Sequence, residues 1–294
     1  MNRIAIDNNI HCETEYAALK KVLVAKPSYM KITEVINETQ KHYIENNIDV
    51  PLAVQQHENF VDVLQQNLVE VAELPADPVL HEQVFTRDIG FTINDQLFVG
   101  SMSEMVRQEE TDVLKDWLKA NALPYEDGLP SSIEGGDVVT DGSTIWIGIS
   151  GRTSHKAIVE LQERLPDHTV EPLQLRKDIL HLDCVFNILG EQTALVYTPA
   201  FSRRGLAKIK ARFNVIPVTK EEQFHMGPNV LSIGDNKVIS LPQNERLNRV
   251  MQRKGFNVVP VNFSEIIKSG GSFRCCTLPL QREMENDHNE PGIN

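Results

Sequence analysis

The chain has 294 residues, of which 41% are hydrophobic and 24% charged, the usual make-up of a globular protein with a sizeable core. The 29 Lys and Arg against 41 Asp and Glu give a formal net charge of −12, which argues against nucleic-acid binding because that needs basic surfaces. No apolar run reaches membrane-spanning length and the N-terminus lacks a signal-peptide pattern, so we expect no membrane partner. The four cysteines lack CxxC spacing, which predicts free thiols and a cytoplasmic protein. Homo-oligomerisation is left open.

The first predicted elements are a strand at 20–27, a helix at 52–68 and a strand at 69–74. Four predicted hairpins follow, with turns at Asp95, Asp141, Gly190 and Asp235, and each is flanked by apolar strand-like runs. An amphipathic helix and then a short strand are expected after each hairpin. The expected helices cover 106–118, 157–165, 206–213 and 247–251, and the strands 123–128, 168–175, 214–219 and 256–261.

A fifth unit is split between the chain ends. Residues 272–280 would supply one strand of its hairpin and 20–27 the other. The sequence therefore predicts an α/β fold of five ββαβ modules in a pseudo-fivefold propeller closed by both termini, which would remove exposed sheet edges. We expect one domain over 1–294, with a loose polar tail at about 285–294. The alternative is an unrelated fold in which strands and helices alternate.

Three acidic residues each precede a hairpin turn by seven positions: Asp88, Glu134 and Asp183. Equal offsets from equivalent turns would bring the three carboxyl groups to one end of related hairpins. Because like charges so close together are costly, we expect a cation between them. Taken singly, Asp88 could instead form a surface ion pair with Arg87, and Glu134 could simply open a turn with the two glycines that follow it.

His181 and Cys275 are the candidates for reactive groups. If 181–184 is a strand, His181 and Asp183 share a face and suit acid–base chemistry, while Cys184 faces away. The alternative is a histidine satisfied by a backbone carbonyl. A metal site built from His181, Asp183 and a cysteine has no HxxxH or CxxC spacing to support it. Cys275 could equally be an inert core residue, and strand alternation would turn Arg274 away from it.

Together, FTRD at 85–88, EGGD at 134–137, HLD at 181–183 and GGSFRC at 270–275 resemble motifs of the guanidine-modifying enzymes. That superfamily includes arginine deiminases, dimethylarginine dimethylaminohydrolases and arginine amidinotransferases. The resemblance extends from about residue 15 to 280, and the family fold is a five-module propeller.

The resemblance implies a role for each matched residue. Cys275 matches the nucleophile, His181 the general acid–base and Glu134 the acid that steadies the guanidinium. The other matched positions bind substrate: the carboxylates Asp88 and Asp183, Arg152 as the receiver of an α-carboxylate, and Phe85 beside them. It also implies that no metal or organic cofactor is needed. Cys276 would turn away from the site.

The implied activity is hydrolysis of a small cationic guanidino substrate through a covalent amidino-thioether on Cys275. The compact length resembles the dimethylarginine hydrolases, whereas FTRD and HLD look more like arginine deiminase motifs. N-methylated arginine is therefore the leading substrate. Plain arginine, or amidino transfer from another guanidino compound, is the alternative. A non-enzymatic propeller binding protein is the alternative from a different class, and the combined presence of Cys275, His181 and Glu134 argues against it.

Overall fold

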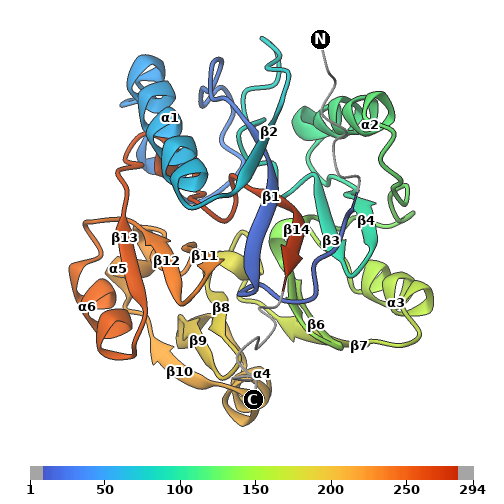
Figure 1. Ribbon diagram of the computed structural model, residues 1–294, viewed down its shortest axis with the longest axis vertical. Helices are drawn as coiled ribbons and strands as arrows, with labels where there is room; N and C mark the ends of the chain where they lie inside the picture. The colour runs from blue at the N-terminus through green and yellow to red at the C-terminus, as the bar shows by residue number, and fades with distance from the viewer. Residues whose placement is uncertain (1–8, 284–294) are drawn as a thin grey trace, which may run out of the picture.

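The computed structural model describes residues 9–283, so the expected polar tail at 285–294 lies outside the described residues. Within residues 9–283 the strands form five separate small sheets. Figure 1 shows these sheets grouped around the middle of the molecule, with the helices on the outside. The α/β class is therefore as predicted. Within the described residues no sheet closes on itself, because each strand pairs only with strands of its own sheet.

The unit split between the chain ends has formed a sheet. Strand β1 (Ala18–Ala25) pairs antiparallel with β14 (Leu278–Glu283) and parallel with β2 (Glu70–Leu74). Between β1 and β2 the chain forms α1 (Val50–Gln66), which begins at Asp49, whose carboxylate accepts the Leu52 amide, with a proline in the first turn. Residues nearly 260 positions apart thus complete one hairpin.

Three of the other four sheets follow the predicted order of hairpin, helix and strand, and the β3–β4 sheet has the hairpin and the helix. The bounds are β3 (Gly90–Ile93), β4 (Gln96–Val99) and α2 (Glu110–Ala120); β5 (Val138–Asp141), β6 (Thr144–Ile149), α3 (His155–Arg164) and β7 (Thr169–Gln174); β8 (Phe186–Gly190), β9 (Thr193–Val196), α4 (Arg203–Arg212) and β10 (Asn214–Pro217); and β11 (Leu231–Gly234), β12 (Lys237–Ser240), α6 (Glu245–Arg253) and β13 (Asn257–Pro260). Strands β7, β10 and β13 each run parallel to the second strand of their hairpin.

Several local predictions were wrong. The strand expected at 123–128 is a single bridge between Glu126 and Phe98, so the β3–β4 sheet has two strands. Two of the hairpin turns lie one residue later than predicted, since Asp141 pairs with Thr144 and Gly190 with Thr193. The short helix α5 (Lys220–Phe224), which begins with a capping box, was not predicted.

The N-terminal segment joins sheets that do not pair with one another. Cys12 bridges to Asn94 at the β3–β4 turn, and Thr14 bridges to Asp141 at the end of β5. The core is built from the inner faces of the sheets and the buried faces of the helices. One part of it, formed by Phe60 with Phe263 and Phe273, lies in the same apolar cluster as Cys275.

Candidate active site

Four of the predicted residues lie just before the first strand of a hairpin. Asp88 precedes β3, Cys275 precedes β14, and Glu134 and His181 each precede a 3₁₀ turn, η3 (Gly135–Asp137) and η4 (Leu182–Cys184). The prediction of strands at 181–184 and 272–277 was wrong, because both segments turn before the strand begins. The turns change which side chains share a face, so strand alternation does not apply there.

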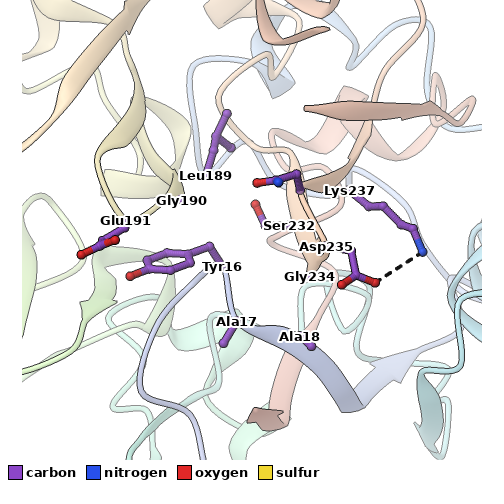
Figure 2. Close-up of a pocket in the computed structure, with 11 residues that line it drawn as sticks. Tyr16, Ala17, Ala18, Leu189, Gly190, Glu191, Ser232, Gly234, Asp235 and Lys237 are labelled. Atoms are coloured by element: carbon purple, nitrogen blue, oxygen red, sulfur yellow. Dashed lines mark ion pairs between the residues drawn. The ribbon is translucent and has the colours of Figure 1, made fainter. Parts of the chain in front are cut away.

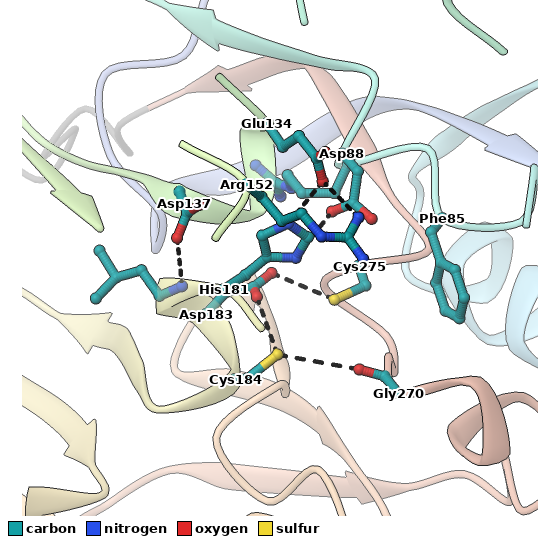
Figure 3. Close-up of polar contacts among 12 residues, drawn as sticks. Phe85, Asp88, Glu134, Asp137, Arg152, His181, Asp183, Cys184, Gly270 and Cys275 are labelled. Carbon is teal, nitrogen blue, oxygen red and sulfur yellow. Dashed lines mark hydrogen bonds and ion pairs between the residues drawn. The ribbon is translucent and has the colours of Figure 1, made fainter. Parts of the chain in front are cut away.

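Asp88, Glu134 and His181 meet in one buried group. His181 Nε2 lies 2.8 Å from Glu134 Oε2, and His181 Nδ1 lies 3.6 Å from Asp88 Oδ1. All three side chains are almost completely buried, and Asp88 Oδ1 and His181 Nδ1 have no hydrogen-bond partner among the described residues. Figure 3 shows the imidazole between the two carboxylates. Two predicted acids and the predicted histidine are therefore brought together.

Two glycines make this meeting sterically possible. A Cβ on Gly135 would lie 2.1 Å from the Arg87 carbonyl oxygen, and one on Gly136 would lie 2.7 Å from both Asp88 Oδ1 and His181 Nδ1. The segment after Glu134 can approach the other two residues only without side chains. The two glycines therefore allow a close approach between separate segments of the chain.

Cys275 lies beside a different set of polar groups. Its sulfur is 3.4 Å from Asp183 Oδ2 and accepts a hydrogen bond of 3.0 Å from Asn229 Nδ2. The Asn229 Oδ1 atom accepts the amide N–H groups of Ser272 and Cys275, which fixes the turn that carries the thiol. The third predicted acid, Asp183, thus borders the sulfur and is not in the Asp88 group.

The electrostatics favour a charged histidine and a neutral thiol. Burial would lower the pKa of His181, but the charge of Asp88 and the hydrogen bond with Glu134 outweigh it and raise that pKa to about 10. Burial, hydrogen bonding with Cys184 and the charge of Asp183 raise the pKa of Cys275 well above its usual value. In the structure without ligand, the imidazolium and the thiol are the favoured forms.

The cations expected between the acids are supplied by the chain itself. Arg107 Nη1 lies 2.6 Å from Asp88 Oδ2, Arg274 Nη1 lies 2.8 Å from Asp183 Oδ2, and Arg152 Nη1 lies 3.6 Å from Glu134 Oε2. Each of the three acids therefore has an arginine partner. The pairing of Asp88 with Arg87 considered from the sequence is wrong, since Arg107 takes that place. A bound guanidinium group would have to share or displace these partners.

Five of the predicted site residues line one narrow pocket, whereas Glu134 and Asp183 lie behind it, in contact with His181 and Cys275. The residues around it are Ile36, Asn37, Glu82, Phe85, Asp88, Arg107, Arg152, Leu180, His181, Ser269, Gly270, Gly271 and Cys275. Phe85 closes one side of the pocket. Its ring packs so closely on Gly271 that a Cβ there would lie only 2.4 Å from the ring and clash with it. Arg152 also donates to the Ile36 carbonyl at 2.7 Å, and so ties the segment at 36–37 to the pocket. Cys276 is buried and is not part of the lining, as expected.

Sequence reasoning missed or discounted three contributors. Asp137 holds the pair of 3₁₀ turns, accepting the Leu182 amide at 2.9 Å and the Ser150 hydroxyl at 2.6 Å. Arg274 was expected to point away, but its guanidinium contacts Asp183. Asn229 lies six residues before its hairpin turn at Asp235, the same distance as Asp88 from Asn94. The repeat register could have identified Asn229 if polar as well as acidic residues had been compared.

The same geometry bears on metal binding. One ligand atom each from Asp88, Glu134 and His181 lie within 4.8 Å of one another, a spacing that a metal ion could use. Asp88 is already bonded to Arg107, and Glu134 to His181. A metal would have to replace an arginine and a histidine hydrogen bond. The carboxylates of Asp88 and Glu134 therefore suit a cation that donates hydrogen bonds better than they suit a metal ion.

A wider hollow lies elsewhere on the molecule, between the β8–β9 and β11–β12 turns and the start of β1 (Figure 2). Tyr16 and Glu191 lie on one side of it, and Asp235 with Lys237, 3.8 Å apart, on the other. Among the described residues that line this hollow, none is a nucleophile paired with a base. The narrow pocket, and not this hollow, is the candidate active site. No helix in residues 9–283 has the length and apolarity to cross a membrane.

Comparison with known proteins identifies the family to which the chain belongs. Residues 26–282 match the family model described as N,N dimethylarginine dimethylhydrolase, eukaryotic. The chain belongs to this family. It is thereby a member of the guanidine-modifying superfamily that the sequence motifs indicated.

Curated relatives lie in the same superfamily. The chain is 48% identical over 271 residues to the uncharacterized protein YkgA of Bacillus subtilis, covering 92% of this chain and 95% of the relative. It is 28% identical over 204 residues to the N(G),N(G)-dimethylarginine dimethylaminohydrolase of Mycobacterium tuberculosis (68% and 67% covered). It is 26% identical over 266 residues to an arginine deiminase of Borreliella afzelii (74% and 65%). These relatives support hydrolytic guanidine chemistry in general terms.

Solved structures support the fold. The N-terminal domain of ArgZ, a cyanobacterial arginine dihydrolase crystallised with its substrate, superposes with a TM-score of 0.83 at 23% identity, covering 89% of this chain and 98% of that one. The amidinotransferase SxtG from Microseira wollei gives 0.82 at 17% identity, covering 94% and 98%. At these identities the likeness concerns the architecture.

Proposed function

We propose that the protein is a cysteine-dependent hydrolase of a small guanidino compound, with N-methylated arginine as the leading substrate. The observation that carries the proposal is that Cys275, His181 and Asp88 line one pocket, while Glu134 is hydrogen-bonded to His181. This combination offers a nucleophile, a proton donor and an anionic grip for a cation. The family membership supports the same class of chemistry.

The nucleophilic step begins with activation of Cys275. Its thiol is the favoured form in the absence of ligand, so the substrate must supply the charge that lowers its pKa. A guanidinium held by Asp88 would lie next to the sulfur and favour the thiolate, which the Asn229 hydrogen bond also stabilises. The Cys275 proton passes to solvent water, and the thiolate then attacks the guanidinium carbon, forming a C–S bond while a C–N π electron pair moves onto nitrogen. The thiolate therefore forms only when the cationic substrate is bound.

The proton transfers are assigned to His181. Because its pKa is raised to about 10, it carries the proton needed by the departing amine at neutral pH. When the C–N bond of the tetrahedral adduct breaks, the imidazolium donates that proton to the amine. The neutral imidazole then takes a proton from the water that attacks the amidino-thioether. When the second adduct collapses, the C–S bond breaks and the hydroxyl proton passes to the departing sulfur, which releases the ureido product and leaves the thiol and the imidazolium. Glu134 keeps the ring oriented throughout.

The remaining assignments concern substrate binding. Asp88 is proposed to bind the guanidinium nitrogens, and Phe85 to cover the reacting group. Asp183 is proposed to act beside the sulfur, where it completes the anionic surround of the cation. Arg152 is proposed to receive an α-carboxylate after releasing its contact with the Ile36 carbonyl.

The leaving amine distinguishes the alternatives within the superfamily. Loss of methylamines would make the protein a dimethylarginine hydrolase like the mycobacterial relative, and loss of ammonia would make it a deiminase. Transfer of the amidino group to an amine would make it an amidinotransferase. We further propose that the chain is a single catalytic domain built on a plan of five ββαβ modules around a pseudo-fivefold axis, with the last strand of the β3–β4 unit reduced to a bridge, and that it acts in the cytoplasm without a cofactor.

A substrate panel tests the proposal. Purified protein is incubated with dimethylarginine, arginine and agmatine, and methylamine, ammonia and ureido products are measured with and without an added acceptor amine. Cys275→Ala should abolish turnover of whichever compound reacts, whereas Cys276→Ala should retain it. A haloacetamidine should label Cys275 selectively, as read by mass spectrometry. If no compound reacts and Cys275 is not labelled, the enzyme proposal fails and the binding-protein alternative stands.

A further inference from the structure

The sulfur of Cys184 lies on the same carboxylate as the sulfur of Cys275. Cys184 Sγ is 3.6 Å from Asp183 Oδ1, and Cys275 Sγ is 3.4 Å from Asp183 Oδ2. Figure 3 shows the two sulfur atoms on the same side of the site, linked through this one side chain. The two thiols come from opposite ends of the fold, one from η4 and the other from the turn before β14.

The two thiols are also near each other, since hydrogen bonding with Cys184 is among the causes that raise the pKa of Cys275. Gly270 and Gly271 border the pair, and the Gly270 carbonyl oxygen is 4.0 Å from Cys184 Sγ. A Cβ on Gly271 would lie 2.9 Å from Cys275 Cβ, so a side chain there would crowd the nucleophile. A change of cysteine rotamer moves its sulfur by about 3 Å. Such a movement can bring the sulfurs toward the roughly 2.0 Å of a disulfide bond.

The two cysteines also face neighbouring pockets. Cys275 lines the narrow pocket, and Cys184 lines an adjoining one together with Arg176, Tyr197 and Phe224. The two pockets share Gly270. A small neutral oxidant can therefore approach the pair from two sides.

The other cysteines are poorer partners for Cys275. Cys276 is its neighbour in sequence, and a disulfide between adjacent cysteines closes a strained ring. Cys12 lies beside the Pro279 carbonyl, 3.7 Å from its oxygen, in a different part of the core. All four cysteines are free in this structure, as the sequence predicted.

We propose that Cys184 and Cys275 are an oxidisable thiol pair, in which peroxide oxidises Cys275 and Cys184 then closes a disulfide that removes the nucleophile. The Cys275 thiol passes its proton to Asp183 and its sulfur attacks one oxygen of hydrogen peroxide; the O–O bond breaks, a sulfenic acid forms, and the hydroxide leaves with that proton as one water. The Cys184 thiol passes its proton to Asp183 and its sulfur attacks the Cys275 sulfur. The S–O bond breaks, and the hydroxide leaves with that proton as a second water. Two thiols thus lose two electrons to one peroxide.

The pair changes what oxidation does to the protein. A lone sulfenic acid is open to further oxidation to the irreversible sulfinic acid, whereas a disulfide is restored by thiols. Cys184 would therefore protect Cys275 and switch the site off reversibly. The effect on turnover rests on the proposed function of Cys275, but formation of the disulfide does not.

Disulfide mapping tests the pair without any assay of activity. The full chain is exposed to excess hydrogen peroxide, free thiols are alkylated, and a tryptic digest is examined without reduction. Cys184 lies in the peptide 178–203, and Cys275 shares the peptide 275–282 with Cys276. The Cys276→Ser variant removes this ambiguity, and its two peptides should be linked. Linkage should be absent from Cys184→Ser and Cys184→Ala, whose thermal unfolding is compared with that of wild type.

A second experiment compares how far the turnover of each protein recovers from oxidation. Each protein's turnover is followed against its own starting value, before peroxide, after it, and after dithiothreitol. Wild type should regain most of its turnover, whereas both Cys184 variants should stay inactive and carry a sulfinic or sulfonic acid at Cys275. The proposal is overturned if Cys275 is overoxidised in wild type without linkage to Cys184, or if the Cys184 variants recover as fully as wild type. If no guanidine is turned over at all, the proposed function fails while the mapping still decides on the thiol pair.

Discussion

Replacement of Arg274 by glutamine tests the buried charge network beneath the candidate site. Arg274 is 1% exposed, and its guanidinium lies 2.8 Å from Glu15 Oε1 and 2.8 Å from Asp183 Oδ2. Removing the cation leaves two buried carboxylates without their principal partner. Breaking a buried ion pair in this way costs about 3–5 kcal/mol. Arg274→Gln should therefore lower the free energy of unfolding by about that amount at neutral pH.

The pKa of Glu15 gives the pH dependence of the loss. Burial would raise this pKa, but the charges of Arg274 and Arg87 outweigh it and lower it from 4.5 to about 2. At about 1.4 kcal/mol per pH unit, the difference corresponds to roughly 3 kcal/mol of stability. Because the folded-state pKa is lowered, this stability is present above about pH 4.5 and is lost as the pH falls toward 2. The difference in free energy of unfolding between wild type and Arg274→Gln should accordingly become smaller as the solution is acidified below pH 4.5.

Urea unfolding, followed by the fluorescence of the two tryptophans, measures both effects between pH 7 and pH 3. Arg253→Gln is the matched control, because Arg253 is exposed at the end of α6 and should change stability by less than about 0.5 kcal/mol. The reasoning would be refuted by a loss below about 1 kcal/mol for Arg274→Gln at neutral pH. A gap that stays constant on acidification would refute the assignment to Glu15.

Three further predictions concern the site and the core. Gly136→Ala should abolish turnover, because its Cβ would displace His181 and Asp88, whereas Gly151→Ala has open space and should behave as wild type in the same assay. In wild type the raised pKa of His181 contributes stability that is present below about pH 6.5 and is lost as the pH rises toward 10. The free energy of unfolding of His181→Gln should therefore change less with pH over that range, and a pH dependence equal to that of wild type would contradict the assignment. Phe60→Ala should cost about 3–5 kcal/mol in denaturant unfolding, since its ring packs against two phenylalanines, and a cost under about 1 kcal/mol would show that the cavity collapses.

The sequence by itself determined most of the order of elements, with α5 and the fate of the strand expected at 123–128 as the exceptions. Apolar runs separated by turn residues predict hairpins, and helical spacing of apolar residues predicts the helices, because both signals are local. The repeat of these patterns also predicted that the strand expected at 20–27 pairs with one near the C-terminus, as β1 and β14 do. The motifs indicated the superfamily and the residues Cys275, His181, Glu134 and Asp88.

Only the tertiary structure decided how those residues meet. Whether a carboxylate binds a substrate or an arginine depends on which side chains the rest of the fold brings to it. Arg107 lies nineteen positions from Asp88 in the sequence, and Arg274 lies ninety-one positions from Asp183. Strand alternation does not hold in η4 or in the turn before β14. Side chains from distant segments accept the backbone amides of these turns: Asp137 accepts that of Leu182 and Asn229 that of Cys275. The nearness of Cys184 to Cys275 follows from the same long-range contacts. Local patterns carry no information about such meetings, since they depend on how separate hairpins pack around a shared centre.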